Sequence, residues 1–329
     1  MQTIAERKNR MPIIDMSIAE LREYRGINPR PNDFDDYWDL ALKEMSAVEP
    51  NVELRPSFFQ VPNADCFDLY FTGVRDARIH AKYVRPKYAE GPHPAIIQFH
   101  GYASNAGDWT SKLAWASLGW SVIAMDSRGQ GGLSEDVGGV KGTTLHGHII
   151  RGLDDDKENM LFRHIFLDTA ELANIVMGLP EVDPDRVGVT GWSQGGGLAL
   201  ACSALVPGIK RVAPVYPFLS DYRRVWEMDL AKNAYEEIRD YFRRHDPRHQ
   251  REQAIFTRLG YIDVQHLANR IRGEVMFGTG LMDEICPPSA QFAIYNKIKM
   301  PKRMEIFPDY GHEELPGMSD LITQFMMEL

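Results

Sequence analysis

The sequence predicts an α/β protein with a doubly wound, mostly parallel sheet, antiparallel N-terminal strands and a helical insertion. From residue 95 onward, short apolar runs alternate with helical stretches, which is typical of a parallel sheet covered on both faces. Between residues 52 and 84 apolar and polar residues alternate instead, as they do in antiparallel strands with one exposed face. A serine flanked by glycines then stands between a strand pattern and a helix pattern, at Gly191 to Gly195.

The N-terminal residues 1–50 predict a helical extension. Ser17 and Glu20 have the spacing of a capping box, so a short helix should begin there and end near Gly26. Asn32 or Asp33 should cap a second helix over residues 34–45, whose apolar residues share one face. This extension is too small to fold alone, and we expect it to pack on the outside of the main body or on another subunit.

The strands follow in order. Three antiparallel strands are expected around residues 58–59, 67–71 and 79–84. Parallel strands are expected at 95–99 and 121–125, with a helix over 109–118 between them, and then near 187, 212–215, 275–277 and 304–307.

Two connections are too long for plain loops. Residues 127–156 are glycine-rich and should run over the catalytic edge of the sheet. Residues 218–270 carry helical patterning and should form a cap over the pocket. With these assigned, residues 1–329 are predicted to be one domain.

Composition excludes several classes of function. The chain has 329 residues and a net charge of −9, which disfavours nonspecific binding to nucleic acid or to an anionic membrane. No run of about eighteen apolar residues is present, and the polar N-terminus does not resemble a secretory signal. Cys66, Cys202 and Cys286 are odd in number and far apart, as expected of reduced thiols, so a cytoplasmic location is predicted.

The stretch Gly191-Trp192-Ser193-Gln194-Gly195 predicts the nucleophile of the site. Between a strand and a helix, Gly-x-Ser-x-Gly is typical of a nucleophile elbow, in which the turn is too tight for larger side chains. An antiparallel start, a doubly wound sheet and a serine elbow in its middle together predict the α/β-hydrolase fold.

The partners of Ser193 are predicted from chain order. In this fold the acid and the histidine follow the serine, each at the carboxyl end of a strand. Asp283 follows the run at 275–280, and His312 follows the strand at 304–307, so the predicted triad is Ser193, Asp283 and His312.

Other acids compete for the place of Asp283. Asp221 follows the strand that ends near residue 216 and is an alternative acid. Asp309 and Glu313 lie too near His312 in sequence to reach its far ring nitrogen easily, and Glu284 should point elsewhere.

An oxyanion hole needs two backbone N–H donors. The amide of Gln194 is one, and the amide of Tyr102, in the loop after the strand at 95–99, is predicted to be the other. His100 in the same loop is expected to be structural, and Arg128 to anchor the next loop through an ion pair.

No metal or cofactor is predicted. His146 and His148 lie near the acids 154–156, but their spacing matches no common zinc pattern. His245 and His249 are separated by a proline, which spoils a helical ligand pair. Cys286 is expected to be a small buried residue.

A set of motifs resembles the signature of the acetyl xylan esterase and cephalosporin C deacetylase family (carbohydrate esterase family 7). The motifs are Arg128-Gly129-Gln130, the elbow at Gly191 to Gly195 and His312-Glu313, with further matches at 24–26, 163–168, 216–219 and 286–289. The resemblance implies an intracellular, metal-independent serine esterase that removes acetyl groups from small sugars such as xylo-oligosaccharides and from cephalosporin C. It also implies a homohexamer, the triad Ser193, Asp283 and His312, and oxyanion amides at Tyr102 and Gln194.

Two other functions remain alternatives at this stage. A serine peptidase of the same fold usually carries a large N-terminal propeller, whereas fewer than a hundred residues precede the hydrolase core here. A non-catalytic binding protein of this fold typically lacks a triad residue, whereas all three are present.

Overall fold

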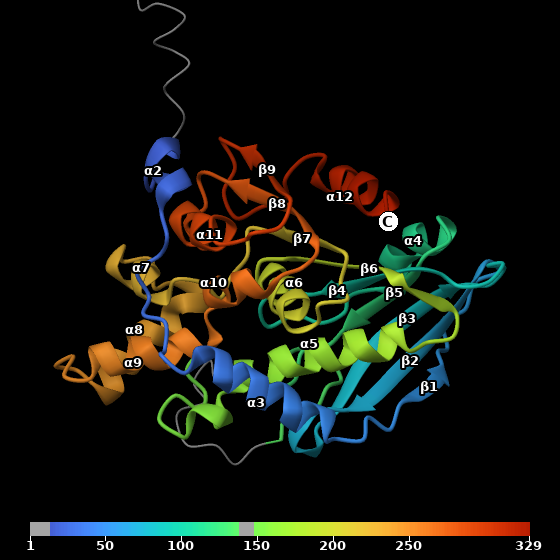
Figure 1. Cartoon of the computed structure of the whole chain (residues 1–329), viewed down its shortest axis with the longest axis horizontal. Coiled ribbons are helices and arrows are strands. Elements are labelled where there is room, and N and C mark those ends of the chain that lie inside the picture. The colour runs from blue at the N-terminus through green and yellow to red at the C-terminus, as the bar shows by residue number, and fades with distance from the viewer. Residues whose placement is uncertain (1–13, 138–147) are drawn as a thin grey trace, which may run out of the picture.

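The computed structural model describes residues 14–137 and 148–329, which contain one nine-stranded sheet (Figure 1). The strand order is β1-β2-β3-β5-β4-β6-β7-β8-β9. Strands β1 and β2, β2 and β3, and β3 and β5 pair antiparallel. All other neighbouring strands in the sheet are parallel. The strands are β1 (Glu53–Pro56), β2 (Ala64–Thr72), β3 (Arg78–Pro86), β4 (His93–Phe99), β5 (Ser121–Met125), β6 (Val182–Trp192), β7 (Arg211–Val215), β8 (Glu274–Gly280) and β9 (Lys302–Phe307).

The predicted parallel strands and the two later antiparallel strands are confirmed, but the position of the first strand is wrong. Strand β1 ends at Pro56, and Phe58 is 96% exposed. The side chain of Gln60 accepts a hydrogen bond from the Cys66 amide at 3.1 Å and donates to its carbonyl at 2.7 Å. The Cys66 carbonyl also accepts from the Ser57 amide at 2.9 Å, so beyond β1 one backbone bond and the Gln60 side chain share the Cys66 peptide groups.

Helices cover both faces of the sheet. On one face α5 and α6 enclose the larger apolar core with α3 outside them, and on the other face α4 and α12 enclose a second core that contains Trp115 and Phe325. The helices are α2 (Ile18–Glu23), α3 (Phe34–Ser46), α4 (Leu113–Ser117), α5 (Leu161–Met177), α6 (Gln194–Leu205), α7 (Tyr222–Glu227), α8 (Glu236–His245), α9 (Glu252–Leu259), α10 (Val264–Leu267), α11 (Pro288–Tyr295) and α12 (Met318–Met327). Short 3-10 turns are η1 (Val74–Asp76), η2 (Trp109–Lys112), η3 (Lys157–Asn159), η4 (Asn233–Tyr235), η5 (Gly260–Ile262) and η6 (Ala268–Arg270). The helix expected over 109–118 is thus η2 followed by α4.

The N-terminal extension packs on the main body of its own chain. Helix α2 has the predicted capping box at Ser17, and its Leu21 packs with Leu281 and Phe292. In α3 the ring of Trp38 stacks on Phe166 of α5 at 5.8 Å. These contacts favour packing of the extension on the main body, the first of the two positions that the sequence analysis expected.

Asp33 precedes α3 but does not cap it as predicted. Its carboxylate accepts hydrogen bonds from Lys157 and from the Tyr261 hydroxyl, and no side-chain cap bond is made. A long-range cation and hydroxyl thus compete successfully with the local amide for this carboxylate.

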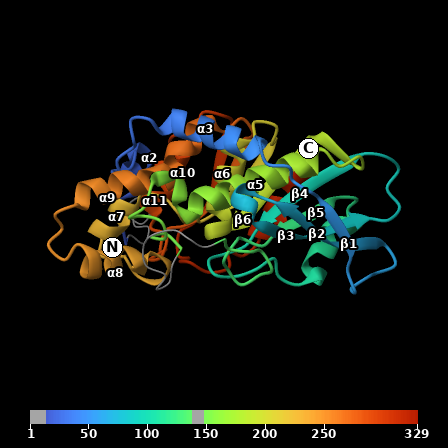
Figure 2. The ribbon, with the colours of Figure 1, turned by 90° about the horizontal axis from the view of Figure 1, so that it is seen from below.

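The insertion at 218–270 is helical, as predicted, and supplies α7 to α10. Figures 1 and 2 show α7, α8 and α9 at the opposite end of the molecule from β1, β2 and β3. Part of the other long connection, residues 138–147, lies outside the described residues. Among the described helices none is both long enough and apolar enough to cross a lipid bilayer.

Candidate active site

Ser193 stands at a strained turn between β6 and α6. Its backbone has φ 56° and ψ −119°, a combination that non-glycine residues adopt only when the surroundings enforce it. A Cβ on Gly191 would lie 2.3 Å from the backbone of Gly195, and a Cβ on Gly195 would lie 2.0 Å from the Phe99 carbonyl oxygen. The two flanking glycines are therefore required by close backbone approach, and the turn between β6 and α6 has the tight geometry that was predicted for a nucleophile elbow.

The three predicted triad residues come together in one hydrogen-bonded chain. His312 Nε2 lies 3.0 Å from Ser193 Oγ, and His312 Nδ1 lies 2.9 Å from Asp283 Oδ2. With Nδ1 protonated, the imidazole donates to the carboxylate and accepts from the serine hydroxyl. The ring of Tyr216 packs against the imidazole, with centroids 4.5 Å apart, and limits its rotation.

Asp283 is fully buried and held on both oxygens. Its Oδ1 accepts from the amides of Ile285 and Cys286 at 2.9 and 2.8 Å, and Gln291 Nε2 lies 3.4 Å from Oδ2. Backbone donors on the loop after β8 thus aim the carboxylate at His312. Groups that are fixed in this way keep their orientation during a reaction.

The competing acids lie elsewhere. Glu284, Asp309 and Glu313 are exposed, and the Glu313 carboxylate accepts from the Gly311 amide at 3.0 Å. Asp221 is buried, but its oxygens accept from the Tyr24 hydroxyl at 2.8 Å and from the amides of residues 27 and 28 at 3.0 and 2.8 Å. Asp221 therefore holds the N-terminal segment, whereas Asp283 is the acid bonded to His312.

The two amides predicted to form the oxyanion hole have no acceptor among the described residues. No hydrogen bond joins the N–H of Tyr102 or of Gln194 to another part of the described chain, and Gln194 is the first residue of α6. Helix N-termini direct unpaired N–H groups and a positive dipole end toward negative charge. Both predicted amides thus have the donor capacity that an oxyanion hole needs.

Gln130 is a neighbour of this region that the sequence reasoning did not assign. Its side chain exchanges two hydrogen bonds of 2.9 Å with the side chain of Gln194, and its Oε1 also accepts from the Ala103 amide at 3.0 Å. One side chain therefore joins the residue after the serine to the loop that carries Tyr102. Gln130 follows Arg128 in the loop after β5, at the carboxyl edge of the sheet, and this position could have indicated a role in holding the site.

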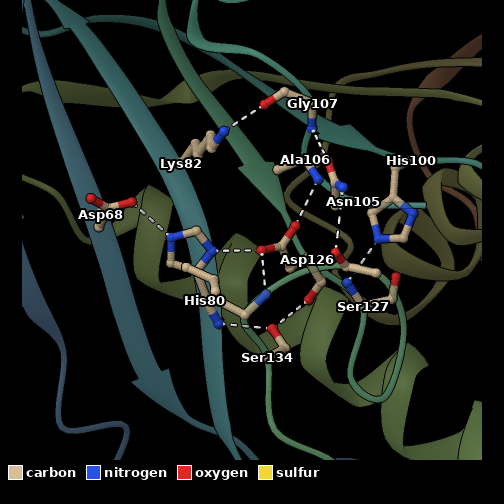
Figure 3. Close-up of polar contacts among 12 residues, drawn as sticks. Asp68, His80, Lys82, His100, Asn105, Ala106, Gly107, Asp126, Ser127 and Ser134 are labelled. Atoms are coloured by element: carbon tan, nitrogen blue, oxygen red, sulfur yellow. Dashed lines mark hydrogen bonds and ion pairs between the residues drawn. The ribbon is translucent and has the colours of Figure 1, made fainter. Parts of the chain in front are cut away.

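A buried polar network supports the same two loops (Figure 3). His80 of β3 lies between two carboxylates, with Nδ1 2.6 Å from Asp126 and Nε2 2.9 Å from Asp68. Asp126 in turn accepts from the amides of Ala106 and Leu133 at 2.6 and 2.9 Å. One carboxylate at the end of β5 thus fixes the loop after β4 and the loop after β5 relative to each other.

His100 has the structural role that was expected. Its Nδ1 lies 2.7 Å from the Gly101 carbonyl, and its Nε2 accepts from the Ser127 amide at 2.9 Å. Burial lowers the pKa of His100, which favours the neutral ring that these two bonds require.

Arg128 anchors its loop through an ion pair, as predicted. Its guanidinium donates to both oxygens of Asp168 at 2.6 and 2.5 Å, and both side chains are buried. Burial raises the pKa of Asp168, while the Arg128 charge opposes that shift.

The candidate metal ligands fall into separate groups. Among the described residues, Asp283, Cys286 and His312 form the one group whose possible metal-ligand atoms lie within 4.8 Å of one another. Asp283 and His312 are already hydrogen-bonded to each other in the predicted triad. Cys286 is buried as expected, and burial raises its thiol pKa well above the usual value.

Near the other histidines, Asp154 pairs with Arg251 at 3.0 Å, and His249 stacks on Phe242 at 4.6 Å. His148 packs edge-on against Tyr102 at 4.8 Å, and His146 lies outside the described residues.

Comparison with known proteins agrees with this geometry. A model of the acetyl xylan esterase family (AXE1) matches residues 11–329. Acetyl xylan esterase 1 of Thermoanaerobacterium sp. JW/SL YS485 is 64% identical, with a TM-score of 0.95 over 96% of this chain and 99% of that one. The acetyl xylan esterase of Paenibacillus sp. R4 is 33% identical, with a TM-score of 0.91 over 95% of this chain and 99% of that one. The α/β-hydrolase fold is therefore confirmed.

A curated relative is longer. The acetyl esterase Axe7A of Xylanibacter ruminicola is 28% identical over 299 residues, which are 86% of this chain. The chain spans 63% of the length of that relative.

Proposed function

The chain belongs to the acetyl xylan esterase family, and we propose that it is a serine esterase that removes acetyl groups from small acetylated molecules, with Ser193, Asp283 and His312 as its triad. The observation that carries this proposal is the continuous chain from Asp283 through His312 to Ser193, with links of 2.9 and 3.0 Å. The family match supports the reaction class, because its other members named above are acetyl esterases.

The proposed mechanism follows from the hydrogen bonds. His312 Nε2 takes the proton of Ser193 as Oγ attacks the acetyl carbonyl, and Asp283 stabilises the imidazolium that forms. The amides of Tyr102 and Gln194 receive the oxyanion. His312 then protonates the departing alcohol, and a water molecule, activated by the same imidazole, releases acetate from the acetyl-serine.

The proposed substrates are acetylated xylo-oligosaccharides, and the acetyl ester of cephalosporin C. The names of the similar esterases support the first, and the motif resemblance alone supports the second. We expect a shallow acyl slot beside Ser193, because the ring of Tyr102 packs edge-on against His148 and against Phe218, at 4.8 and 5.5 Å. Such aromatic crowding favours acetyl over longer acyl groups.

Assembly and location are also proposals. A homohexamer in the cytoplasm, with residues 1–329 as one catalytic domain and 218–270 as its cap, agrees with the family resemblance. The three cysteines, all buried and free, are compatible with a reducing compartment. Size-exclusion chromatography with light scattering tests the hexamer directly.

The catalytic proposal is tested with p-nitrophenyl acetate and a peptide p-nitroanilide. Wild type should cleave the ester and leave the amide intact, and Ser193→Ala should abolish turnover while the circular dichroism spectrum stays unchanged. A serine-directed phosphonate should label wild type at Ser193 and leave the variant unlabelled. Turnover retained in Ser193→Ala would overturn the assignment, and faster cleavage of the amide would favour a peptidase.

A further inference from the structure

Glu237 is a buried acid in the insertion that the proposed mechanism does not use. It lies on α8 and is 1% exposed. Its Oε1 accepts from the Tyr102 hydroxyl and from the His148 amide at 3.2 Å. Its Oε2 accepts from the amides of Ile149 and Ile150 at 2.8 and 3.3 Å. This carboxylate therefore joins the insertion, the loop after β4 and the end of the long loop before α5.

The donors to Glu237 in the described part of the chain are neutral. Among the described residues, Glu237 accepts four hydrogen bonds, each from a hydroxyl or a backbone amide, and forms no ion pair. A carboxylate taken out of water is costly unless its hydrogen-bonding capacity is filled. Two donors on each oxygen fill it here, so removal of the carboxylate leaves four donors without an acceptor.

The contact with Tyr102 reaches one of the proposed oxyanion donors. The hydroxyl is held by Glu237, and the ring is packed edge-on against His148 at 4.8 Å and Phe218 at 5.5 Å. Burial and the Glu237 charge raise the pKa of Tyr102, so the hydroxyl stays a donor. Since the side chain is fixed at its tip and on two sides, it limits the movement of its own main-chain N–H. The next amide along the loop is fixed as well, by Gln130.

We propose that Glu237 is a positioning residue for the oxyanion hole, through which the helical insertion holds the amide of Tyr102 in place. The inference rests on the proposed esterase function, because it assigns the Tyr102 amide to the oxyanion. The insertion thus takes part in building the catalytic site. Oxyanion donors act on the transition state more than on bound substrate, so their displacement lowers kcat more than it raises KM.

The test compares five variants with p-nitrophenyl acetate. Glu237→Ala removes the acceptor, and Tyr102→Phe removes the hydroxyl but keeps the main-chain amide. Loss of a whole oxyanion donor costs about 100- to 1,000-fold in kcat, so a misplaced donor should cost roughly 10- to 100-fold, with KM changed less than about threefold. Because both variants break one link, the double variant should be little worse than either single variant.

Glu237→Gln should restore most of the activity. Its carbonyl oxygen can accept from the amides of Ile149 and Ile150, while its NH₂ group donates to the Tyr102 hydroxyl oxygen, so that only the His148 amide loses its acceptor. The matched control is Glu236→Ala, which removes the neighbouring carboxylate on the exposed side of the same helix and should keep wild-type kcat.

The outcomes separate the two proposals. A folded Glu237→Ala or Tyr102→Phe variant with wild-type kcat overturns the positioning role, as does a change in KM alone or an additive double variant. If Glu237→Ala fails to fold, Tyr102→Phe and Glu237→Gln carry the test, since each keeps the buried volume nearly intact. Wild type without acetyl esterase activity would instead overturn the proposed function itself.

Discussion

Replacement of Asp283 by Asn tests the assignment of the acid most directly, because the change keeps the size of the side chain and removes its charge. The remaining oxygen should stay on the amides of Ile285 and Cys286, which hold Oδ1 at 2.9 and 2.8 Å. The new NH₂ group then faces His312 Nδ1, which must accept instead of donate. His312 Nε2 becomes protonated and can no longer take the proton of Ser193.

The expected loss is large and falls on kcat. The same substitution in a serine protease triad lowers kcat by about 10,000-fold because it produces the wrong tautomer. At about 1.4 kcal/mol per tenfold change, this is roughly 5 kcal/mol of transition-state stabilisation. The fold should persist, because the two amide contacts that order the loop are retained.

Steady-state kinetics with p-nitrophenyl acetate at one pH, combined with thermal unfolding, is the measurement. Asp221→Asn is the matched control, since Asp221 is equally buried but binds Tyr24 and the amides of residues 27 and 28. The control should lose stability and keep kcat within about tenfold of wild type. If folded Asp221→Asn lost more kcat than folded Asp283→Asn, the assignment of the acid would be wrong.

Three further predictions concern specificity and stability. The value of kcat/KM should fall steeply from p-nitrophenyl acetate through butyrate to octanoate, since each poorly fitting methylene costs about 1–3 kcal/mol; equal or rising values would indicate a lipase-like pocket. Burial and the Asp221 charge raise the pKa of Asp263 to about 7, so its contribution to stability is complete below about pH 4 and is lost as the pH rises toward 7. Wild type should therefore lose unfolding free energy relative to Asp263→Asn between about pH 4 and 7 in urea titrations, and a constant difference would contradict this. Arg128→Ala should cost roughly 3–5 kcal/mol in the same assay, because Asp168 stays buried without its cation, whereas Arg128→Met with Asp168→Leu should recover most of that loss.

Much of the fold follows from local patterns in the chain. The apolar runs after residue 95 predict strands because a parallel sheet buries both faces of each strand, and all of these strands are present. The elbow at Ser193 is also a local feature, since its glycines are required by backbone contacts that the turn itself creates. The acid and the histidine could be predicted because the chain order of the fold places them after particular strands.

Other features depend on contacts between distant parts of the chain. From the sequence, Asp221 was an alternative to Asp283 as the acid. In the structure His312, which lies 29 residues after Asp283 in the chain, is hydrogen-bonded to Asp283 and not to Asp221. The expected first strand near residue 58 is replaced by the Gln60 side chain, and the expected cap at Asp33 is lost to Lys157, 124 residues away.

The sequence by itself predicted the serine elbow, the chain order of the proposed triad and the class of sheet, because each follows from spacing along the chain. The tertiary structure alone decided which polar side chains hold the site. Glu237 meets Tyr102 from 135 residues away, Gln130 meets Gln194 from 64, and His80 meets Asp126 from 46. No local sequence pattern predicts such pairs. They form only when separate elements pack so that a buried donor faces a buried acceptor.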